Sequence, residues 1–387
     1  MSGRAIIRLT EKPGPSPPLK FLLVYERGDA GANAVLLASD IAATGAHVYV
    51  LLESLVKARM PERVMQLPAA PLSPFRLISS VERAVLACSP DIVLPLSEQM
   101  LHRFWDASPD WLPLVHPIID PGMRMYYRDR HLMAGLLSGK GVVVPEIRQL
   151  KANTAEEILS LIDELGLPVV VKGPRGEGGE QVRIAETADD AIATANELYI
   201  ETRTLPALQE YIDGPVYQVG GLFDDGRPIR LLAGEKTEML PPRTGPAIAL
   251  KSCDEPDLVE AAIRVFAVLG HSGIAGADFV RGADGGFRFL EVNPRIWGSW
   301  GFAKRLGIDL FGEWSLQLRG EPLTEDLAFE PDRFWVKMPE YLFAQPKTRR
   351  SILLRSLHPA AIRSWSWGQP RILMYQLRRA YWAFIGN

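Results

Sequence analysis

The sequence predicts an α/β protein of two or three domains, and three observations support that prediction. Its 387 residues exceed the length of one ordinary domain. A hydrophobic fraction of 47% and a charged fraction of 23% are typical of a soluble globular protein. Near the start, an apolar run, a helical pattern and a second apolar run follow one another through short connections. This order favours a parallel sheet with helices packed on it.

Residues 19–120 are expected to form this doubly wound domain, after a flexible leader at 1–18 that is rich in proline. Apolar runs and helical periodicity alternate along it, and Gly45 ends the first helix. The expected elements are strands at 20–26, 47–53 and 91–98, helices at 28–45 and 81–90, and a shorter apolar run at 111–118.

Cysteine use and apolar run lengths exclude several classes of protein. Cys88 and Cys253 lie far apart and have no His or Cys companions at metal-binding spacing. That argues against a disulfide scaffold or a zinc site and fits a reducing cytoplasm. No apolar run approaches eighteen residues and the start has no sustained apolar core, so we expect neither a membrane-spanning helix nor a signal peptide. The expected location is cytoplasmic.

The middle of the chain carries a pattern suited to phosphate. Lys172 ends a β-branched strand at 167–174, and a hairpin with three glycines follows it (Gly176, Gly178, Gly179). Glycines let backbone N–H groups close over phosphate oxygens, and the lysine adds a positive charge. The alternative is a flexible turn with a solvated lysine. A helix at 153–166 precedes the strand, with Thr154 and Glu157 at capping-box spacing.

A second pattern combines carboxylate, amide and guanidinium groups near residue 290. Glu291 and Asn293 are two apart in a strand and share one face, and Arg295 follows at the turn. The side-chain oxygens of Glu291 and Asn293 are ligands that Mg²⁺ accepts, and the Arg295 guanidinium can neutralise a phosphoryl group or an oxyanion. In the hairpin expected at 274–295, Asp278 would lie within reach of both ligands. The alternative is a strand that ends in a Glu–Arg salt bridge.

The remaining elements expected before residue 270 alternate between helices and strands. They are a helix and then a strand within 128–144, a glycine-rich hairpin that leads into a strand within 175–186, a helix at 188–199, strands at 207–214, 215–223 and 227–237, and a helix at 256–270.

Five motifs in this order resemble the ATP-grasp superfamily, closest to its carbamoyl-phosphate-synthase-like branch and the carboxylate–amine ligase relatives. They are D-R at 129–130, V-V-V-K-G-P with the glycine loop at 169–179, Q-E-Y-I-D-G at 209–214, G-A-D-F-V at 276–280 and F-L-E-V-N-P-R at 289–295. The resemblance covers about 19–320. It implies that a pre-ATP-grasp domain at 19–120 precedes a two-lobed ATP-grasp domain at 121–325, which has an ATP lid subdomain at about 145–212.

The resemblance also implies roles for individual residues. Arg130 and Lys172 would bind the ATP phosphates, and Gly176, Gly178 and Gly179 would form a lid over them. Glu210, Tyr211 and Ile212 would bind adenine. Asp278, Glu291 and Asn293 would bind Mg²⁺, or alternatively Mn²⁺, and Arg295 would stabilise the phosphorylated intermediate. Lys236 and Arg243 lie where related enzymes place groups that face the phosphate or the acceptor substrate. The alternative is that both are ordinary solvated charges of a loop. Many relatives place a ribose-binding Glu where this chain has Val216, which leaves Asp213 or Gln218 for that contact.

The expected function is that of an ATP-dependent carboxylate ligase. ATP would phosphorylate a carboxylate, and an amine, thiol or other nucleophile would displace phosphate from the acyl phosphate. The alternatives are a nucleotide- or metabolite-binding protein whose catalysis has decayed, and a phosphotransferase that stops at the phosphorylated product. The sequence does not reveal the carboxylate or the nucleophile, because variable loops build those pockets.

Residues 326–387 are expected to form a basic, Trp-rich helical extension. From 341 to the end there are eight Lys or Arg and no Asp or Glu. In the last segment one helical face gathers apolar residues, namely Leu373, Leu377, Ala380, Tyr381 and Phe384. The preferred interpretation is that the extension packs on the acidic body or forms a homodimer contact. The alternative is contact with an anionic membrane surface, and no nucleic-acid partner is expected.

Overall fold

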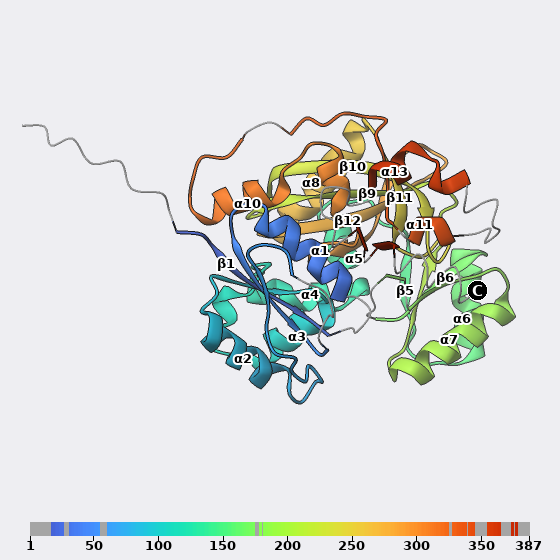
Figure 1. Cartoon of the computed structure of the whole chain (residues 1–387). Helices are drawn as coiled ribbons and strands as arrows, with labels where there is room; N and C mark the ends of the chain where they lie inside the picture. The colour runs from blue at the N-terminus through green and yellow to red at the C-terminus, as the bar shows by residue number, and fades with distance from the viewer. Residues whose placement is uncertain are drawn as a thin grey trace, which may run out of the picture.

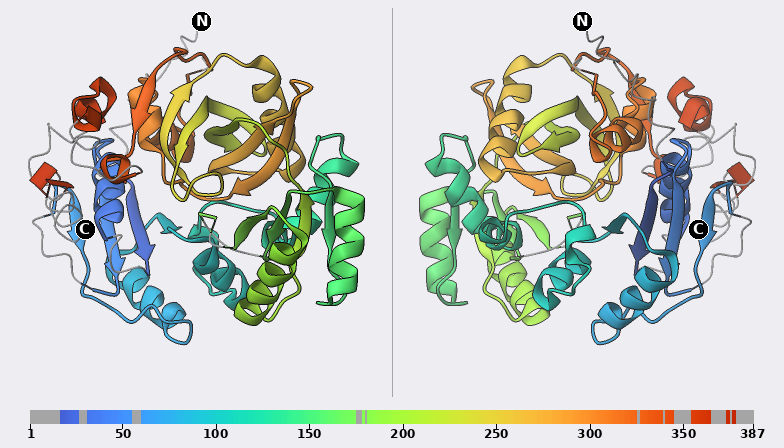
Figure 2. Two further views of the ribbon diagram at one scale, coloured as in Figure 1. Left: turned by 90° about the vertical axis from the view of Figure 1, so that its right-hand side faces the viewer. Right: turned by 90° about the vertical axis from the view of Figure 1, so that its left-hand side faces the viewer.

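A computed structural model of the chain confirms the α/β class and builds the fold on three sheets in the part that it describes (Figure 1). The described residues are 17–26, 31–54, 60–174, 178–179, 181–324, 327–338, 340–344, 354–364, 373–374 and 376–377. In Figure 2 the small green sheet lies below the large yellow and orange sheet, and the blue N-terminal domain lies to one side of both.

The N-terminal sheet is parallel, as expected, with the strand order β3-β2-β1-β4. Its elements are β1 (Lys20–Tyr25), α1 (Gly31–Ala42), β2 (His47–Leu52), β3 (Val64–Gln66), α2 (Leu77–Cys88), β4 (Ile92–Pro95) and α3 (Glu98–Ala107). The strand expected at 91–98 is longer than the observed β4, which ends at Pro95. Ser97 accepts a hydrogen bond from the Met100 backbone N–H and caps α3, so Glu98 begins a helix that the sequence analysis missed.

A connector leads from this sheet to the rest of the chain. It contains η1 (Leu112–Leu114), η2 (Pro121–Met123), α4 (Arg124–Arg128) and α5 (Arg130–Gly139). Asp129 caps α5 by accepting from the His131 and Leu132 backbone N–H groups, which fixes Arg130 at the helix start. The strand expected before residue 145 does not form, although the Val143 carbonyl accepts a hydrogen bond from Phe289.

The small sheet is antiparallel, in the order β5-β8-β6-β7, and two helices cover it. Its elements are β5 (Ile147–Gln149), α6 (Ala155–Leu165), β6 (Val169–Lys172), β7 (Val182–Ala185), α7 (Ala188–Thr202) and β8 (Ala207–Glu210). Thr154 caps α6 as expected, by accepting from Glu157 N–H. The Glu157 carboxylate accepts instead from the backbone N–H groups of Lys151 and Ala152.

The large sheet is antiparallel and has the order β13-β12-β9-β10-β11-β14. Its strands are β9 (Val216–Asp224), β10 (Arg227–Met239), β11 (Ala247–Ser252), β12 (Gly273–Arg281), β13 (Phe287–Asn293) and β14 (Phe334–Val336), with helices α8 (Pro256–Leu269), α9 (Gly301–Arg305) and α10 (Leu310–Leu318). The sequence analysis missed β11, β14, α9 and α10. The domain boundary expected at 325 divides this sheet, because β14 lies beyond it and pairs with β11.

The N-terminal domain is joined to the large sheet by shared hydrophobic cores and by polar contacts. Two clusters of buried apolar side chains each draw members from both units. Asp40 of α1 accepts hydrogen bonds from Trp300 Nε1 at 3.1 Å and from Lys304 Nζ at 3.2 Å. Shared cores of this kind hold two units in a fixed relation.

Part of the basic extension packs on the body. α11 (Glu340–Phe343) and α13 (Pro359–Ser364) belong to a buried cluster with β11 and β14. Arg355 donates to the Glu238 carboxylate of β10 and lies 4.1 Å from the centre of the Tyr341 ring. Most of the apolar face expected at the end of the chain lies outside the described residues. No helix in the described part is long and apolar enough to cross a membrane.

Replacement of Gly220 by alanine tests a close contact in this fold. A Cβ at this position would lie 2.3 Å from the Trp297 indole, so we expect Gly220→Ala to destabilise the protein by about 2 kcal/mol or more. The control is Gly135→Ala in α5, where a Cβ would meet no atom within 4 Å. It should raise stability by about 0.5–1 kcal/mol. Urea unfolding measures both, and equal stability of Gly220→Ala and the native protein would contradict the contact.

Candidate active site

A cavity lies between the small and the large sheets, with about 670 Å³ of space that is partly open to solvent. Apolar side chains from both sheets face each other across it: Val170, Val182 and Ile184 from the small sheet, and Met239, Val280 and Leu290 from the large one. Charged groups gather at one end, where Lys172, Lys236, Asp278 and Glu291 line the wall. An apolar cavity with charged groups at one end suits a ligand that carries an apolar ring and charged substituents.

The strand register brings the acidic residues into one row on the large sheet. Glu291 of β13 lies opposite Asp278 of β12, and Asp278 lies opposite Gln218 of β9. Asn293 is two residues beyond Glu291 and therefore shares its face of the sheet. The predicted oxygen ligands Asp278, Glu291 and Asn293 thus occupy neighbouring positions on one face.

Asp278 is buried and has two partners in the described structure. Lys236 Nζ lies 2.5 Å from Asp278 Oδ2, and Gln218 Nε2 donates to Oδ1 at 3.2 Å. Ser299 in turn donates to the Gln218 carbonyl oxygen at 2.5 Å. Burial raises the pKa of Asp278, and Lys236 opposes that rise. Lys236 therefore contacts one of the predicted metal ligands, Asp278.

Glu291 faces a cation from a different element. Arg130 Nη2, at the start of α5, lies 3.3 Å from Glu291 Oε2, and Arg130 Nη1 donates to the Gly173 carbonyl. Burial alone would raise the pKa of Glu291, but Arg130, Lys172, Lys236 and Arg295 outweigh it, so its pKa lies below the usual value. The carboxylate is therefore ionised at neutral pH.

Lys172 is buried in the cavity wall at the end of β6. Its pKa is lowered to about 8, chiefly by burial and also by Arg130, while Glu291 and Asp278 act in the opposite direction. An amine with this pKa changes its charge near physiological pH, which is uncommon for a lysine.

The glycine loop after Lys172 touches the turn between β10 and β11. Gly178 and Gly179 have φ values of +61° and +79°, and a Cβ on Gly179 would lie 2.2 Å from the Thr244 carbonyl oxygen. Glycine is therefore required here by both backbone conformation and close approach. The predicted lid residue Gly176 lies outside the described residues.

The opposite end of the cavity holds the residues predicted to bind adenine. Glu210, Tyr211 and Ile212 all line it, and one Glu210 oxygen accepts from the Glu146 backbone N–H. Arg243 also lies at this end: it forms a 2.8 Å ion pair with Glu186 and lies 4.8 Å from the centre of the Tyr211 ring. Its contacts in this structure are thus with Glu186 and Tyr211, and a role toward the phosphate or the acceptor stays a prediction.

Arg295 lies beyond the row of carboxylates and meets the N-terminal domain. Arg295 Nη2 donates to Asn293 Oδ1 at 3.4 Å, and Nε lies 3.5 Å from the Glu98 carboxylate at the start of α3. Trp297, two residues on, is fully buried against Gly220 and Gly276. The indole fills the space that these glycines leave open and so fixes the path of the chain through Arg295.

Sequence reasoning missed Glu98 and assigned Gln218 a different use. Glu98 follows β4 at the carboxyl edge of the parallel sheet, where ligands of such sheets bind, and that position was the available signal. Gln218 was one of two candidates for the ribose contact, but its amide bonds Asp278 and Ser299. Asp213, the other candidate for the ribose contact, accepts a hydrogen bond from the Tyr211 hydroxyl at 3.3 Å.

The donor set fits a hard divalent cation. Two carboxylates and an amide oxygen are the ligands that Mg²⁺ accepts together with phosphate oxygens. Within the described residues no group of three or more His, Cys, Asp or Glu is placed to hold a metal ion by itself. Softer metals that prefer thiolate or imidazole ligands do not match this set.

Two of the ion pairs at the cavity, Lys236–Asp278 and Arg243–Glu186, should differ sharply in their effect on stability. Lys236→Met leaves Asp278 buried without its cation, and we expect a loss of about 3 kcal/mol. Arg243→Met breaks a half-exposed pair and should cost under about 1 kcal/mol. Chemical denaturation of both variants measures this difference, and equal losses would show that the Lys236–Asp278 pair has been misjudged.

Comparisons with known proteins agree with this geometry. Residues 128–299 match the ATP-grasp domain. The D-alanine–D-alanine ligase of Desulforudis audaxviator (strain MP104C) is 27% identical over 175 residues, which are 41% of this chain and 55% of that ligase. The chain thus spans about half the length of that curated relative.

Two solved structures share the fold. The L-amino acid ligase from Bacillus licheniformis superposes with a TM-score of 0.62 at 17% identity, over 79% of this chain and 75% of that one. The biotin carboxylase domain of the 2-oxoglutarate carboxylase from Hydrogenobacter thermophilus superposes with a TM-score of 0.63 at 16% identity, over 83% and 73%. Together with the motif order and the site geometry, these findings identify residues 128–299 as an ATP-grasp domain.

Proposed function

We propose that the protein is an ATP-dependent, magnesium-requiring carboxylate ligase that forms an amide-type bond through an acyl phosphate. The observation that carries this proposal is the charged end of the cavity. There Asp278 and Glu291 lie side by side, and Lys172, Lys236 and Arg130 surround them. Oxygen ligands for a metal next to cations for phosphates are what phosphoryl transfer requires.

The similar proteins support the nucleotide and the reaction class. The Hydrogenobacter carboxylase domain was solved with MgADP and bicarbonate, and the Bacillus protein is an amino acid ligase. The Desulforudis relative joins two amino acids. In this chain ATP would place its ring between Val170 and Leu290 and its phosphates near Lys172. The substrates would be a small carboxylate and an amine.

Asp278, Glu291 and Asn293 would hold Mg²⁺, which supplies Lewis-acid neutralisation of the phosphate charge. Lys172 and Arg130 then orient the phosphates, and the Gly178–Gly179 turn closes over them and excludes water. Arg295 lies next to Asn293 and can hold the developing oxyanion at the acyl carbon. Phosphoryl transfer forms the bond from the carboxylate oxygen to phosphorus and breaks the bond to ADP.

A screen of ADP release tests the function. The protein is incubated with MgATP and a panel of carboxylates and amines, and we expect release that depends on both substrates. Glu291→Ala should lower the rate about 100-fold or more, because a metal ligand is lost. Asp284→Asn is the matched control, since Asp284 lies in the exposed turn of the same hairpin. Full turnover in Glu291→Ala would contradict the metal assignment, and release that needs no amine would point to a phosphotransferase.

The charge of Lys172 predicts a pH dependence for ATP. Its pKa of about 8 means that the ammonium is present below pH 8 and is lost as the pH rises through that value. Attraction for the phosphates falls with it, so KM for ATP should rise above pH 8. Lys172→Arg keeps its charge throughout this range and should show a flat profile. Steady-state kinetics between pH 6.5 and about 9.5 measures KM for ATP in both proteins. A parallel rise of KM in the native protein and in Lys172→Arg would rule out Lys172 as the cause.

A further inference from the structure

The C-terminal extension reaches the ATP cavity from behind, at the end of β10. Figure 1 shows α11 and α13 beside β10 and β11, and both helices contribute to a buried cluster with Ala249 of β11. Glu238 of β10 lies opposite Ala249 in the sheet and so points toward this cluster. Its neighbours Lys236 and Met239 line the cavity. The end of β10 therefore carries cavity residues and a contact for the extension side by side.

An irregular register at the end of β10 allows this arrangement. The pairing with β11 shifts between Lys236 and Glu238 and again between Glu238 and Met239. Such a shift re-aims side chains, so Lys236 and Met239 can both line the cavity while Glu238 between them faces the extension. It also disrupts the ladder of hydrogen bonds locally. Contacts from outside the sheet therefore help to hold this part of β10.

Arg355 of the extension supplies such a contact to Glu238. Its Nη1 donates to Glu238 Oε1 at 3.1 Å and its Nη2 donates to Oε2, while its Nε donates to the Tyr341 carbonyl at 2.7 Å. Each nitrogen of the guanidinium is thus engaged, and a two-pronged contact of this kind fixes geometry as well as charge. The Arg355 side chain is 15% exposed and that of Glu238 is 34% exposed, so the pair is partly shielded from water.

The end of β10 leads directly into the turn that meets the glycine loop. Thr244 and Gly245 of this turn line the cavity, as Met239 does. A Cβ on Gly179 of the glycine loop would lie 2.2 Å from the Thr244 carbonyl oxygen. A displacement at Glu238 would therefore alter the cavity wall and the contact that closes the glycine loop.

We propose that Arg355 is a positioning residue of the nucleotide site. By holding Glu238 it fixes the end of β10, and with it Lys236, Met239 and the turn that meets the glycine loop. The inference rests on the ATP-dependent function proposed above and deepens it, because it makes the extension part of the nucleotide site. None of the described residues beyond 291 lines the cavity, so Arg355 acts on the nucleotide through β10.

Binding of MgADP to the full chain, measured by calorimetry, tests this role. Arg355→Met removes the charged fork and keeps most of the side-chain length, so the end of β10 loses its outer contact. We expect the affinity for MgADP to fall about fivefold or more, as for residues that act on a ligand through others. Arg363→Met is the matched control, because Arg363 is an exposed arginine of α13 outside the contact with Glu238.

Further variants show whether the loss of affinity runs through the pair. Glu238→Gln removes the other charge while Arg355 keeps Tyr341, and it should lower the affinity to a similar extent. The double variant should lose no more than either single variant, since both remove the same interaction. Arg355→Lys keeps the charge without the fork and should recover part of the affinity. Ile41→Val in the core beside α1 lowers stability without touching β10 and should bind MgADP as the native protein does.

The outcomes separate this inference from the ligase function. Native affinity in Arg355→Met, or additive losses in the double variant, would overturn the positioning role, and Glu238→Gln decides alone should Arg355→Met not fold. An equal fall of affinity in Ile41→Val would also overturn it, because the loss would then follow stability. If MgADP binding responds as expected and ADP release is never seen, the positioning role stands and the ligase function fails. If the native chain does not bind MgADP, both fail.

Discussion

The rest of the site depends on the pairing of charges around two neighbouring carboxylates, the buried Asp278 and the partly buried Glu291. Asp278 and Glu291 lie opposite each other on adjacent strands, and like charges in that position repel. Burial away from water makes the repulsion stronger, so each carboxylate needs a cation. Lys236 comes from β10 and Arg130 from the start of α5, and neither is close to its partner in sequence. Both carboxylates therefore gain their cations only when the large sheet and the connector have assembled.

A second constraint is steric and acts beside the first. The position next to Asp278 and Glu291 along the sheet is occupied by Gly276 and Gly220, which lie opposite each other on β12 and β9. The Trp297 indole rests on them, and a side chain at Gly220 would overlap it. Because Trp297 is fixed there, the backbone just before it has little freedom, and Arg295 is held between Asn293 and Glu98. Two glycines thus help to position a guanidinium that they do not touch.

The sequence predicted the parts of the site that are encoded locally. Alternation along 287–293 placed Glu291 and Asn293 on one face, and the hairpin brought Asp278 opposite, because strand period and turn position suffice for both. Contacts between segments that are distant in the sequence were harder to predict. The apolar run of β4 continues to Leu96 and concealed the start of α3, so Glu98 passed as a strand end. Arg243 was expected to face the phosphate or the acceptor from the resemblance to related enzymes, and its ion-pair partner Glu186, which follows β7 of the small sheet, was not foreseen.

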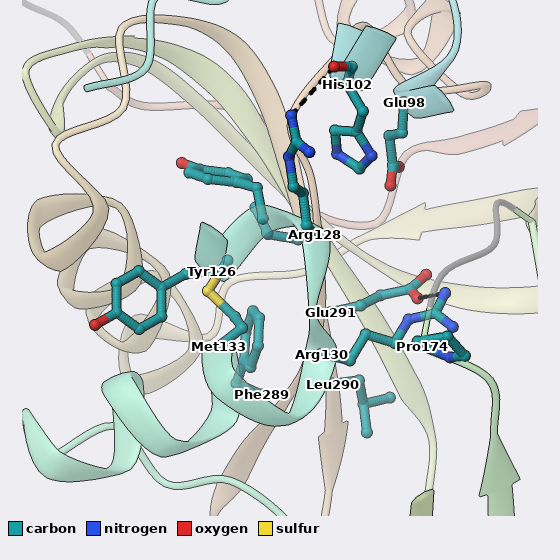
Figure 3. A pocket seen from close by; sticks show the side chains of 12 residues that line it. Glu98, His102, Tyr126, Arg128, Arg130, Met133, Pro174, Phe289, Leu290 and Glu291 are labelled. Carbon is teal, nitrogen blue, oxygen red and sulfur yellow. Dashed lines mark hydrogen bonds and ion pairs between the residues drawn. The ribbon is translucent and has the colours of Figure 1, made fainter. Parts of the chain in front are cut away.

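The ATP cavity shares a wall with a second cavity, which lies between the N-terminal domain, the connector and β13. Leu290 and Glu291 are consecutive in β13 and line both cavities, while Arg130 reaches Glu291 from the second one (Figure 3). In the ligase reaction that we propose, the acyl phosphate would form at this wall, because the predicted metal ligands and the cations for the phosphates meet there.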